Sequence, residues 1–136
     1  MIVPVAKLQG SSLDWSVGLA EFGEAFYKIP DWWFDDRPDG CFLPPFKETG
    51  ESPTVDSFYP SSDMNYGGAI FERARIAVSP ILDRGGWSAS LGDLTFEGRT
   101  LLMAAMRCYV ASKLGPEIDV PNRLLPPELL DQYRIR

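Results

Sequence analysis

The chain has 136 residues, of which 45% are hydrophobic and none is histidine, and its formal net charge is −6. This length and composition are typical of one globular domain, so we expect residues 1–136 to form a single domain. The absence of histidine excludes Ser-His-Asp and Cys-His catalysis and His-ligated zinc. Cys41 and Cys108 have no metal-binding spacing. We therefore expect no metal and no cofactor, and the sequence does not favour an enzyme.

The charge is unevenly distributed along the chain. Residues 1–63 contain four Lys or Arg against eleven Asp or Glu, whereas residues 64–136 contain nine against eight. An acidic surface repels phosphate backbones, so direct nucleic-acid binding is disfavoured. No apolar run approaches the roughly 18 residues of a membrane span, and the N-terminus lacks the pattern of a signal peptide. We expect a cytoplasmic protein without membrane contact.

The first elements predicted are an extended segment and a helix. Residues 2–9 contain β-branched side chains and an early proline, Pro4, which predicts an edge strand or an extended arm. Apolar residues then recur at helical spacing, and Ser11 and Asp14 have the spacing of a capping box, so we predict a helix at about 12–23. Gly18 weakens this helix by about 1 kcal/mol relative to Ala, unless it allows another element to pack closely.

Residues 27–68 form a long irregular segment that is rich in aromatic and acidic residues. The turn sequence at 37–40 separates "DWWFDD" (31–36) from "CFLPPF" (41–46), which predicts a short hairpin. An unstructured loop of this length is rare inside a small domain, so some of its aromatic side chains must pack.

The second half begins with a short helix and two strands. We divide residues 69–80 into a helix and a strand that ends before Pro80, and residues 85–91 predict a partner strand with Trp87 facing inward. Residues 92–99 are interpreted as a loop.

Residues 100–114 give the clearest helix in the chain. Thr100 is the expected N-cap, and Gly115 followed by Pro116 ends the helix. Apolar residues cover nearly its whole circumference, so we interpret it as interior scaffold, with Cys108 a small buried apolar side chain. The stripe expected to face water is Thr100, Ala104, Arg107 and Ala111. Arg107 is expected to pair with a carboxylate, line a pocket or extend to solvent.

The chain ends in an extended segment and a short C-terminal helix that begins near Pro127 and presents Leu129, Leu130 and Tyr133. The predicted fold is therefore α+β. A small, mostly antiparallel sheet packs with two main helices, at about 12–23 and 100–114, and with the short C-terminal helix.

Four segments occur together in an order that is similar to the NinX-like proteins of phages and prophages. They are "LQGSSLDWSVGLA", "YPSSDMNYGGAIFERARIAV", "GGWSASL" and "LLMAAMRCYVASKLGPEIDVP". The chain departs from the family pattern at "EGRTLL" and at Ala69, and residues 27–58 align least. The resemblance implies a small phage-encoded accessory protein that acts in the bacterial cytoplasm, and it transfers no catalytic residue to this chain.

The first candidate site is the junction "PSSDMNYGGAIFER". Gly67 and Gly68 can adopt positive φ and expose backbone N–H groups to an anion. Charged side chains nearby would complete a site for an anionic small molecule, and they are Asp63, Glu72, Arg73 and Arg75. The alternative, which we favour, is a turn followed by a helix in which Glu72 and Arg75 form an ion pair.

The second candidate site is "DWWFDD", which contains Trp32, Trp33 and Phe34. Adjacent tryptophans on a strand cannot both face one core, so one of them is expected to be exposed among acidic residues. An exposed tryptophan of this kind is a typical anchor for a protein partner. The alternative is that the loop buries both.

The sequence therefore favours a non-enzymatic binding protein that modulates a host or phage protein through its acidic, aromatic first half. In one variant the acidic surface imitates DNA towards a nucleic-acid-binding protein. The alternative function is an anionic-ligand binding protein or enzyme that uses Asp63, Glu72, Arg73 and Arg75. Self-association as a homodimer remains open.

Overall fold

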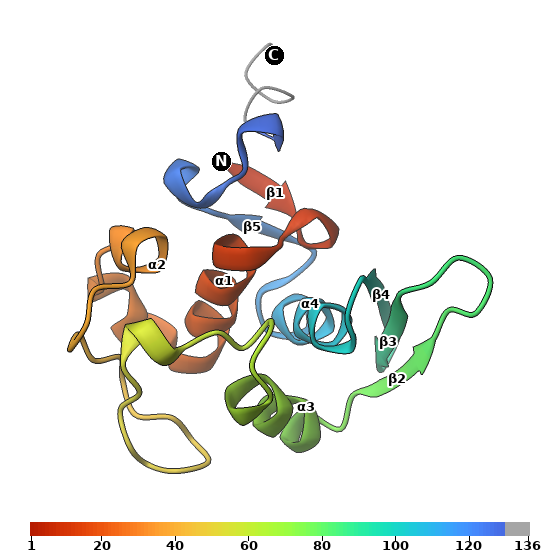
Figure 1. The fold of residues 1–136 in the computed structure, drawn as a ribbon, viewed down its shortest axis with the longest axis horizontal. Coiled ribbons are helices and arrows are strands. Elements are labelled where there is room, and N and C mark those ends of the chain that lie inside the picture. Colours follow the sequence, from red (N-terminus) through yellow and green to blue (C-terminus); the bar gives the residue numbers. More distant parts are fainter. Residues whose placement is uncertain (130–136) are drawn as a thin grey trace.

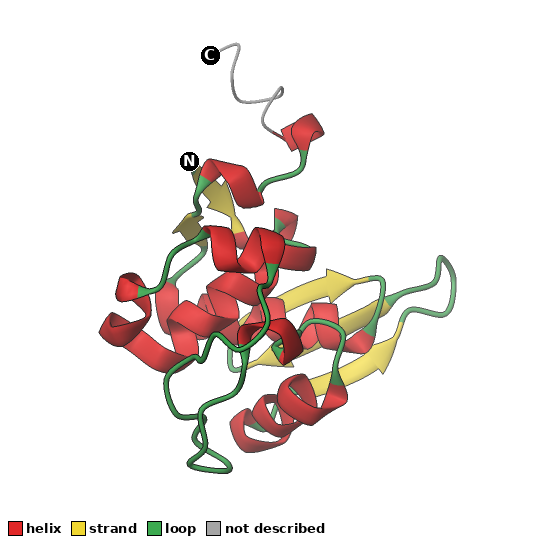
Figure 2. Cartoon of the chain, turned by 60° about the vertical axis from the view of Figure 1, so that its left-hand side comes forward, coloured by secondary structure: helices red, strands yellow, loops and turns green. Residues whose placement is uncertain are grey.

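The computed structural model describes residues 1–129 and has an α+β fold, as predicted. Helix α4 lies between helix α1 and a three-stranded sheet of order β2-β3-β4, while β1 and β5 form a separate ladder (Figures 1 and 2). Both sheets are antiparallel. The strands are β1 (Ile2–Pro4), β2 (Ala77–Pro80), β3 (Trp87–Leu91), β4 (Leu94–Gly98) and β5 (Glu117–Asp119). The α-helices are α1 (Gly10–Phe22), α2 (Trp32–Asp36), α3 (Ala69–Ala74) and α4 (Leu101–Leu114).

Helix α4 is the interior scaffold that the sequence predicts. The Thr100 hydroxyl accepts the Met103 N–H at 3.2 Å, and the helix ends at Gly115, whose φ of 97° suits glycine. The predicted water-facing stripe is right for the exposed Thr100 and the half-buried Arg107 but wrong for Ala104 and Ala111, which are buried. Strands β3 and β4 and helix α1 pack around α4, so little of its circumference remains for solvent.

Arg107 binds backbone carbonyls of neighbouring elements. Its guanidinium donates to the Leu8 carbonyl at 2.8 and 3.0 Å and to the Glu97 carbonyl at 2.6 Å. The carboxylate partner considered from the sequence is therefore replaced by the backbone carbonyl of Leu8, which precedes α1, and that of Glu97 in β4.

The sheet shows the strict alternation of a half-buried antiparallel structure. Val78, Ala89 and Phe96 lie side by side across the three strands on the apolar face, whereas Ser88 and Ser90 lie on the other face. The loop predicted at 92–99 is wrong, because β4 occupies most of it. Gly92, with φ of 60°, allows a two-residue turn between β3 and β4 that the sequence prediction missed.

Helix α1 begins earlier than predicted and has a different cap. The Ser12 hydroxyl receives the Gln9 N–H at 3.0 Å and donates to the Gln9 carbonyl at 2.7 Å, so the capping box expected at Ser11 and Asp14 is wrong. Asp14 points into the protein. Gly18 does permit close packing, because a Cβ there would lie 2.6 Å from the Phe26 ring.

The hairpin predicted within 31–46 is wrong. Residues 32–36 form helix α2, which ends at Arg37 in the left-handed conformation, and Phe42 forms an isolated bridge with Thr54. The aromatic side chains of this long segment do pack, as expected. The fully buried ones are Phe34, Phe46 and Phe58, which join Phe26 in one hydrophobic core.

The remaining segments follow the predictions closely. A π-helical turn (Met64–Gly68) leads into α3 and then β2, which includes Pro80, and Trp87 of β3 packs against the core. Short 3-10 turns occupy Val5–Lys7, Gly23–Lys28, Val55–Ser57 and Asn122–Leu124. Helical backbone begins again at residue 127, but Leu130 and Tyr133 of the predicted C-terminal helix lie outside the described residues. Within residues 1–129, no helix is long and apolar enough to cross a membrane.

Candidate functional site

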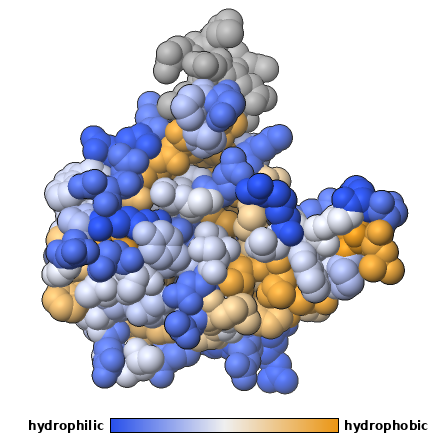
Figure 3. All heavy atoms as spheres, in the orientation of Figure 1, coloured by the Kyte–Doolittle hydropathy of each residue, from blue (hydrophilic) through white to orange (hydrophobic). Residues whose placement is uncertain are grey.

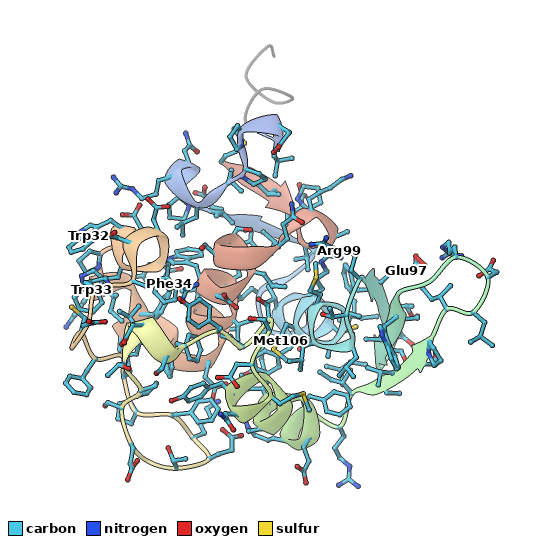
Figure 4. The ribbon with its side chains drawn as sticks, viewed as in Figure 1. Trp32, Trp33, Phe34, Glu97, Arg99 and Met106 are labelled. Carbon is cyan, nitrogen blue, oxygen red and sulfur yellow. The ribbon has the colours of Figure 1, made fainter. Side chains whose placement is uncertain are left out.

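Helix α2 gives its three aromatic residues three different environments. Phe34 is fully buried, with its ring 5.3 Å from that of Phe26. Trp33 is half-buried against the core, and Trp32 is 41% exposed, with the two indole rings edge to face at 6.3 Å. Figure 4 shows the pair at the periphery of the molecule, away from α4. One tryptophan is thus exposed, although the two residues lie on a helical turn and not on the strand that the sequence predicted.

Acidic side chains lie on the same helix as the exposed indole of Trp32. Asp35 and Asp36 follow it on the same short helix and are exposed, while Asp31 forms an ion pair with Arg123 at 3.5 Å. We call Trp32, Asp35 and Asp36 the Trp32 surface. It combines a flat apolar group with negative charge, which suits contact with a basic protein surface.

The junction at 63–68 serves local structure. The Asp63 carboxylate accepts the Asn65 N–H at 2.9 Å, and Gly68 has a φ of −64°, so the positive φ expected of these glycines is absent. Gly67 is required for another reason: a Cβ there would lie 2.0 Å from the Pro60 carbonyl oxygen. The backbone nest considered from the sequence does not form.

Arg73 lies at the centre of an ion-pair network. It donates to the buried Glu21 carboxylate at 2.7 Å and pairs with Glu48, and the Tyr109 hydroxyl donates to Glu21 at 2.7 Å. Burial opposes the Arg73 charge, but the hydrogen bonds to Glu48, Glu21 and Tyr109 prevail and raise its pKa. The network ties α1, α3 and α4 together.

Glu72 and Arg75, the other two charged residues predicted for this site, lie on the surface, and the ion pair favoured between them is wrong, because neither has an ion-pair partner among residues 1–129. They line a shallow hollow of about 450 Å³ together with Glu48 and Arg73. Arg75 has a φ of 57° and ends helix α3. Asp63 does not line this hollow, so the structure brings together three of the four predicted charged residues.

The sequence prediction missed a larger hollow of about 490 Å³ where α1 and α4 both begin. Its floor is an ion pair between Asp14 and Arg37 at 3.0 Å, with side chains that are 2% and 8% exposed. Burial raises the pKa of Asp14, while the Ser61 N–H and the Arg37 guanidinium oppose that rise. Arg37 also donates to the Phe58 carbonyl at 2.7 Å and stacks on Tyr59.

Arg99 lines this hollow and two neighbouring hollows. The second and third hollows measure about 340 Å³ each, and Arg99 lines all three. Within residues 1–129, the Arg99 guanidinium makes no ion pair and no side-chain hydrogen bond. Burial, and then repulsion from Arg99, lowers the pKa of Arg107. We call the three hollows together the Arg99 groove.

The sequence contains a signal for one residue of this groove, Asp14, but not for Arg37 or Arg99. A carboxylate at Asp14, between the apolar Leu13 and Trp15 of an amphipathic helix, predicts a buried charge that needs a partner. Its partner Arg37 lies 23 residues away behind an irregular segment, and no local pattern connects the two. Arg99, directly before the Thr100 cap, was assigned to a loop.

These features define a small α+β protein with an exposed aromatic and acidic surface and a separate arginine-lined groove. Within residues 1–129, no cluster of three or more cysteine, aspartate or glutamate side chains is placed to hold a metal ion. A family model described as "Bacteriophage P22, NinX" matches residues 4–113, and the chain therefore belongs to this family of phage accessory proteins. A comparison with curated proteins found no match.

Proposed function

We propose that the protein is a non-enzymatic phage accessory factor that binds and modulates a host or phage protein in the bacterial cytoplasm. The observation that carries the proposal is the exposed indole of Trp32 beside the acidic Asp35 and Asp36. Tryptophan is enriched among residues that dominate binding energy at protein interfaces, and removal of such an anchor costs about 2 kcal/mol or more.

The distribution of exposed aromatic side chains supports this location. Within residues 1–129, the large aromatic residues that are clearly exposed all come from the first half of the chain, which also carries the excess negative charge. They are Tyr27, Trp32 and Phe42, whereas Tyr59, which is 37% exposed, stacks with Arg37 and lines the Arg99 groove. The partner surface expected from this chemistry has an apolar pocket with a basic rim.

A nucleic-acid-binding partner is one form of this proposal. An acidic surface that imitates DNA would compete with duplex DNA for its partner, and its affinity would fall steeply with salt. A partner that binds unaffected by duplex DNA would exclude this form while leaving the broader proposal intact.

The test compares Trp32→Ala with Leu82→Ala in affinity purification from lysate of the bacterial host. Leu82 is 91% exposed at the tip of the β2–β3 hairpin, so its substitution removes an even more exposed apolar side chain far from α2 (Figure 1). We expect Trp32→Ala to lose a partner that the wild type and Leu82→Ala retain. Equal recovery by all three proteins would contradict the proposal. Trp33 is half-buried against the core, so its substitution would also disturb the fold.

The alternative function, an anionic-ligand protein or enzyme built on Asp63, Glu72, Arg73 and Arg75, has less support. Arg73 is engaged by two carboxylates and Asp63 by a backbone N–H, so neither offers an open binding group. Thermal shift with phosphorylated metabolites tests this function, and light scattering tests the homodimer.

A further inference from the structure

We propose that the Arg99 groove is a second binding site, for a small phosphorylated ligand that also carries an apolar or aromatic group, the chemical class of a nucleoside monophosphate. It lies apart from the Trp32 surface: Figure 4 shows Arg99 beside the start of α4 and Trp32 at the opposite edge of the view. The proposal is independent of the protein partner proposed above.

The charge balance of the groove opposes that of the whole chain. The protein carries a net charge of −6, yet the charged residues that line the three hollows are four arginines and two carboxylates. Asp14 pairs with Arg37 and Glu97 with Arg84, which leaves Arg99 and Arg107 without a carboxylate among residues 1–129. Concave surfaces with an excess of one sign of charge concentrate the electric field and attract ions of the opposite sign.

The two remaining guanidiniums differ in their freedom to bind. Arg107 is already held by the Leu8 and Glu97 carbonyls, so it supplies positive charge from a fixed position. Arg99 is exposed and uncommitted within the described residues, and it therefore offers its fork of donors to an incoming anion. Arginine binds phosphate through two parallel hydrogen bonds, which also fixes the orientation of the ligand.

Hydroxyl groups complete the polar part of the groove. Ser11, Ser62 and Thr100 line the 490 Å³ hollow together with Arg99. Because the Asp14 charge on the floor is matched by Arg37, the floor does not repel an anion. The volume lies within the roughly 300–1,000 Å³ of small-molecule sites.

The neighbouring hollow supplies an apolar part. Met64, Trp87 and Leu101 line it, and it shares Ser62, Arg99 and Thr100 with the polar hollow. Figure 3 shows strongly hydrophilic atoms beside a hydrophobic area on this face, over the region where α4 begins in Figure 1. A phosphate held at Arg99 would therefore place an attached ring against Trp87 and Met64, where aromatic and sulfur contacts favour it.

The experiment measures binding of AMP, adenosine and inorganic phosphate by calorimetry at low salt. We expect saturable binding of AMP that is tighter than binding of either adenosine or phosphate, because only AMP fills both parts of the groove. Arg99→Gln should weaken AMP binding at least about tenfold, since it removes a charge-assisted hydrogen bond. Met64 is 58% exposed, so Met64→Ala should reduce the preference for AMP over phosphate without unfolding the protein.

Arg75→Gln is the matched control, because Arg75 is also an exposed arginine but lies at the hollow predicted from the sequence. It should bind AMP as the wild type does. Absence of saturable AMP binding, equal affinity for AMP and adenosine, or unchanged affinity in Arg99→Gln would each overturn the proposal. AMP binding no tighter than that of phosphate would overturn the apolar part of the site. Loss of AMP binding in Arg75→Gln but not in Arg99→Gln would overturn the proposal and show that AMP binds at the hollow lined by Arg75.

Discussion

Substitution of Arg37 by Met is expected to be among the most damaging single changes to this protein. Met, like Arg, has an unbranched side chain, and it would adopt the same left-handed backbone conformation with a φ of 50°. The main effect of the substitution is therefore the loss of the guanidinium group. That loss leaves the Asp14 carboxylate buried without its partner and the Phe58 carbonyl without a donor. Removing one member of a buried ion pair costs about 3–5 kcal/mol. Domains have about 5–15 kcal/mol of stability in total.

The assay is urea denaturation of the wild type, Arg37→Met and the double variant Asp14→Asn, Arg37→Met at pH 7. Asparagine keeps an oxygen for the Ser61 N–H, which donates to Asp14 at 2.9 Å, but carries no charge. The double variant should therefore be more stable than Arg37→Met. A loss below about 1 kcal/mol in Arg37→Met, as for surface pairs, would refute the argument that this ion pair is buried and needed.

The pH dependence of the same variants gives a second test. Burial raises the pKa of Asp14, so protonation of this group favours the folded state, and its favourable contribution is lost as the pH rises through the raised pKa. Arg37 opposes the rise, so Arg37→Met should raise the pKa of Asp14 further. The stability deficit of Arg37→Met relative to the double variant should accordingly shrink as the pH falls from 7, because only Arg37→Met keeps the Asp14 carboxylate that titrates.

Three further predictions follow from single contacts. Gly67→Ala should lose about 1–3 kcal/mol or more in thermal or urea denaturation, because its Cβ would meet the rigid Pro60 carbonyl. The neighbouring Gly68→Ala, which meets only the flexible end of Met64, should lose much less. Burial, together with the hydrogen bond that the Tyr109 hydroxyl donates to the Glu21 carboxylate, raises the pKa of Tyr109 to about 12. Absorbance titration should therefore show a late tyrosine step that Tyr109→Phe lacks, and stability should fall as the pH rises from about 10 to 12. Burial raises the pKa of the Cys108 thiol, whereas Cys41 is only half-buried, so a thiol reagent should label Cys41 in the native protein and Cys108 only after unfolding. Labelling of both at one rate would contradict the packing of α4.

The sequence predicted those elements whose signals are local. Helix α4 has a cap at Thr100, a stop at Gly115 and an apolar surface between them, so its limits and its burial follow from residues within one segment. The division of residues 69–80 into helix and strand succeeded for the same reason. The sequence left open whether one tryptophan is exposed or both are buried, and Trp32 is exposed although the strand alternation behind that expectation does not occur.

Most of the errors arose where a distant contact decides the structure, and one arose from a local turn. "DWWFDD" was assigned to a strand, but Phe34 packs on Phe26 and Arg37 reaches Asp14, and these contacts favour a helical turn. Strand β4 was missed because Gly92 was interpreted as a loop residue, although a tight turn needs only one or two such positions. Arg99 was overlooked because its importance depends on three hollows that form only when α1, α4 and the sheet come together.

The most direct test of the proposed function is the affinity of the captured partner for purified wild type and for Trp32→Ala, measured by calorimetry at two salt concentrations. If the Trp32 surface is the recognition site, Trp32→Ala should weaken binding by about 2 kcal/mol or more, roughly 30-fold, and added salt should weaken wild-type binding through the acidic residues beside it. Binding that is unchanged in Trp32→Ala and insensitive to salt would show that recognition lies elsewhere on the molecule.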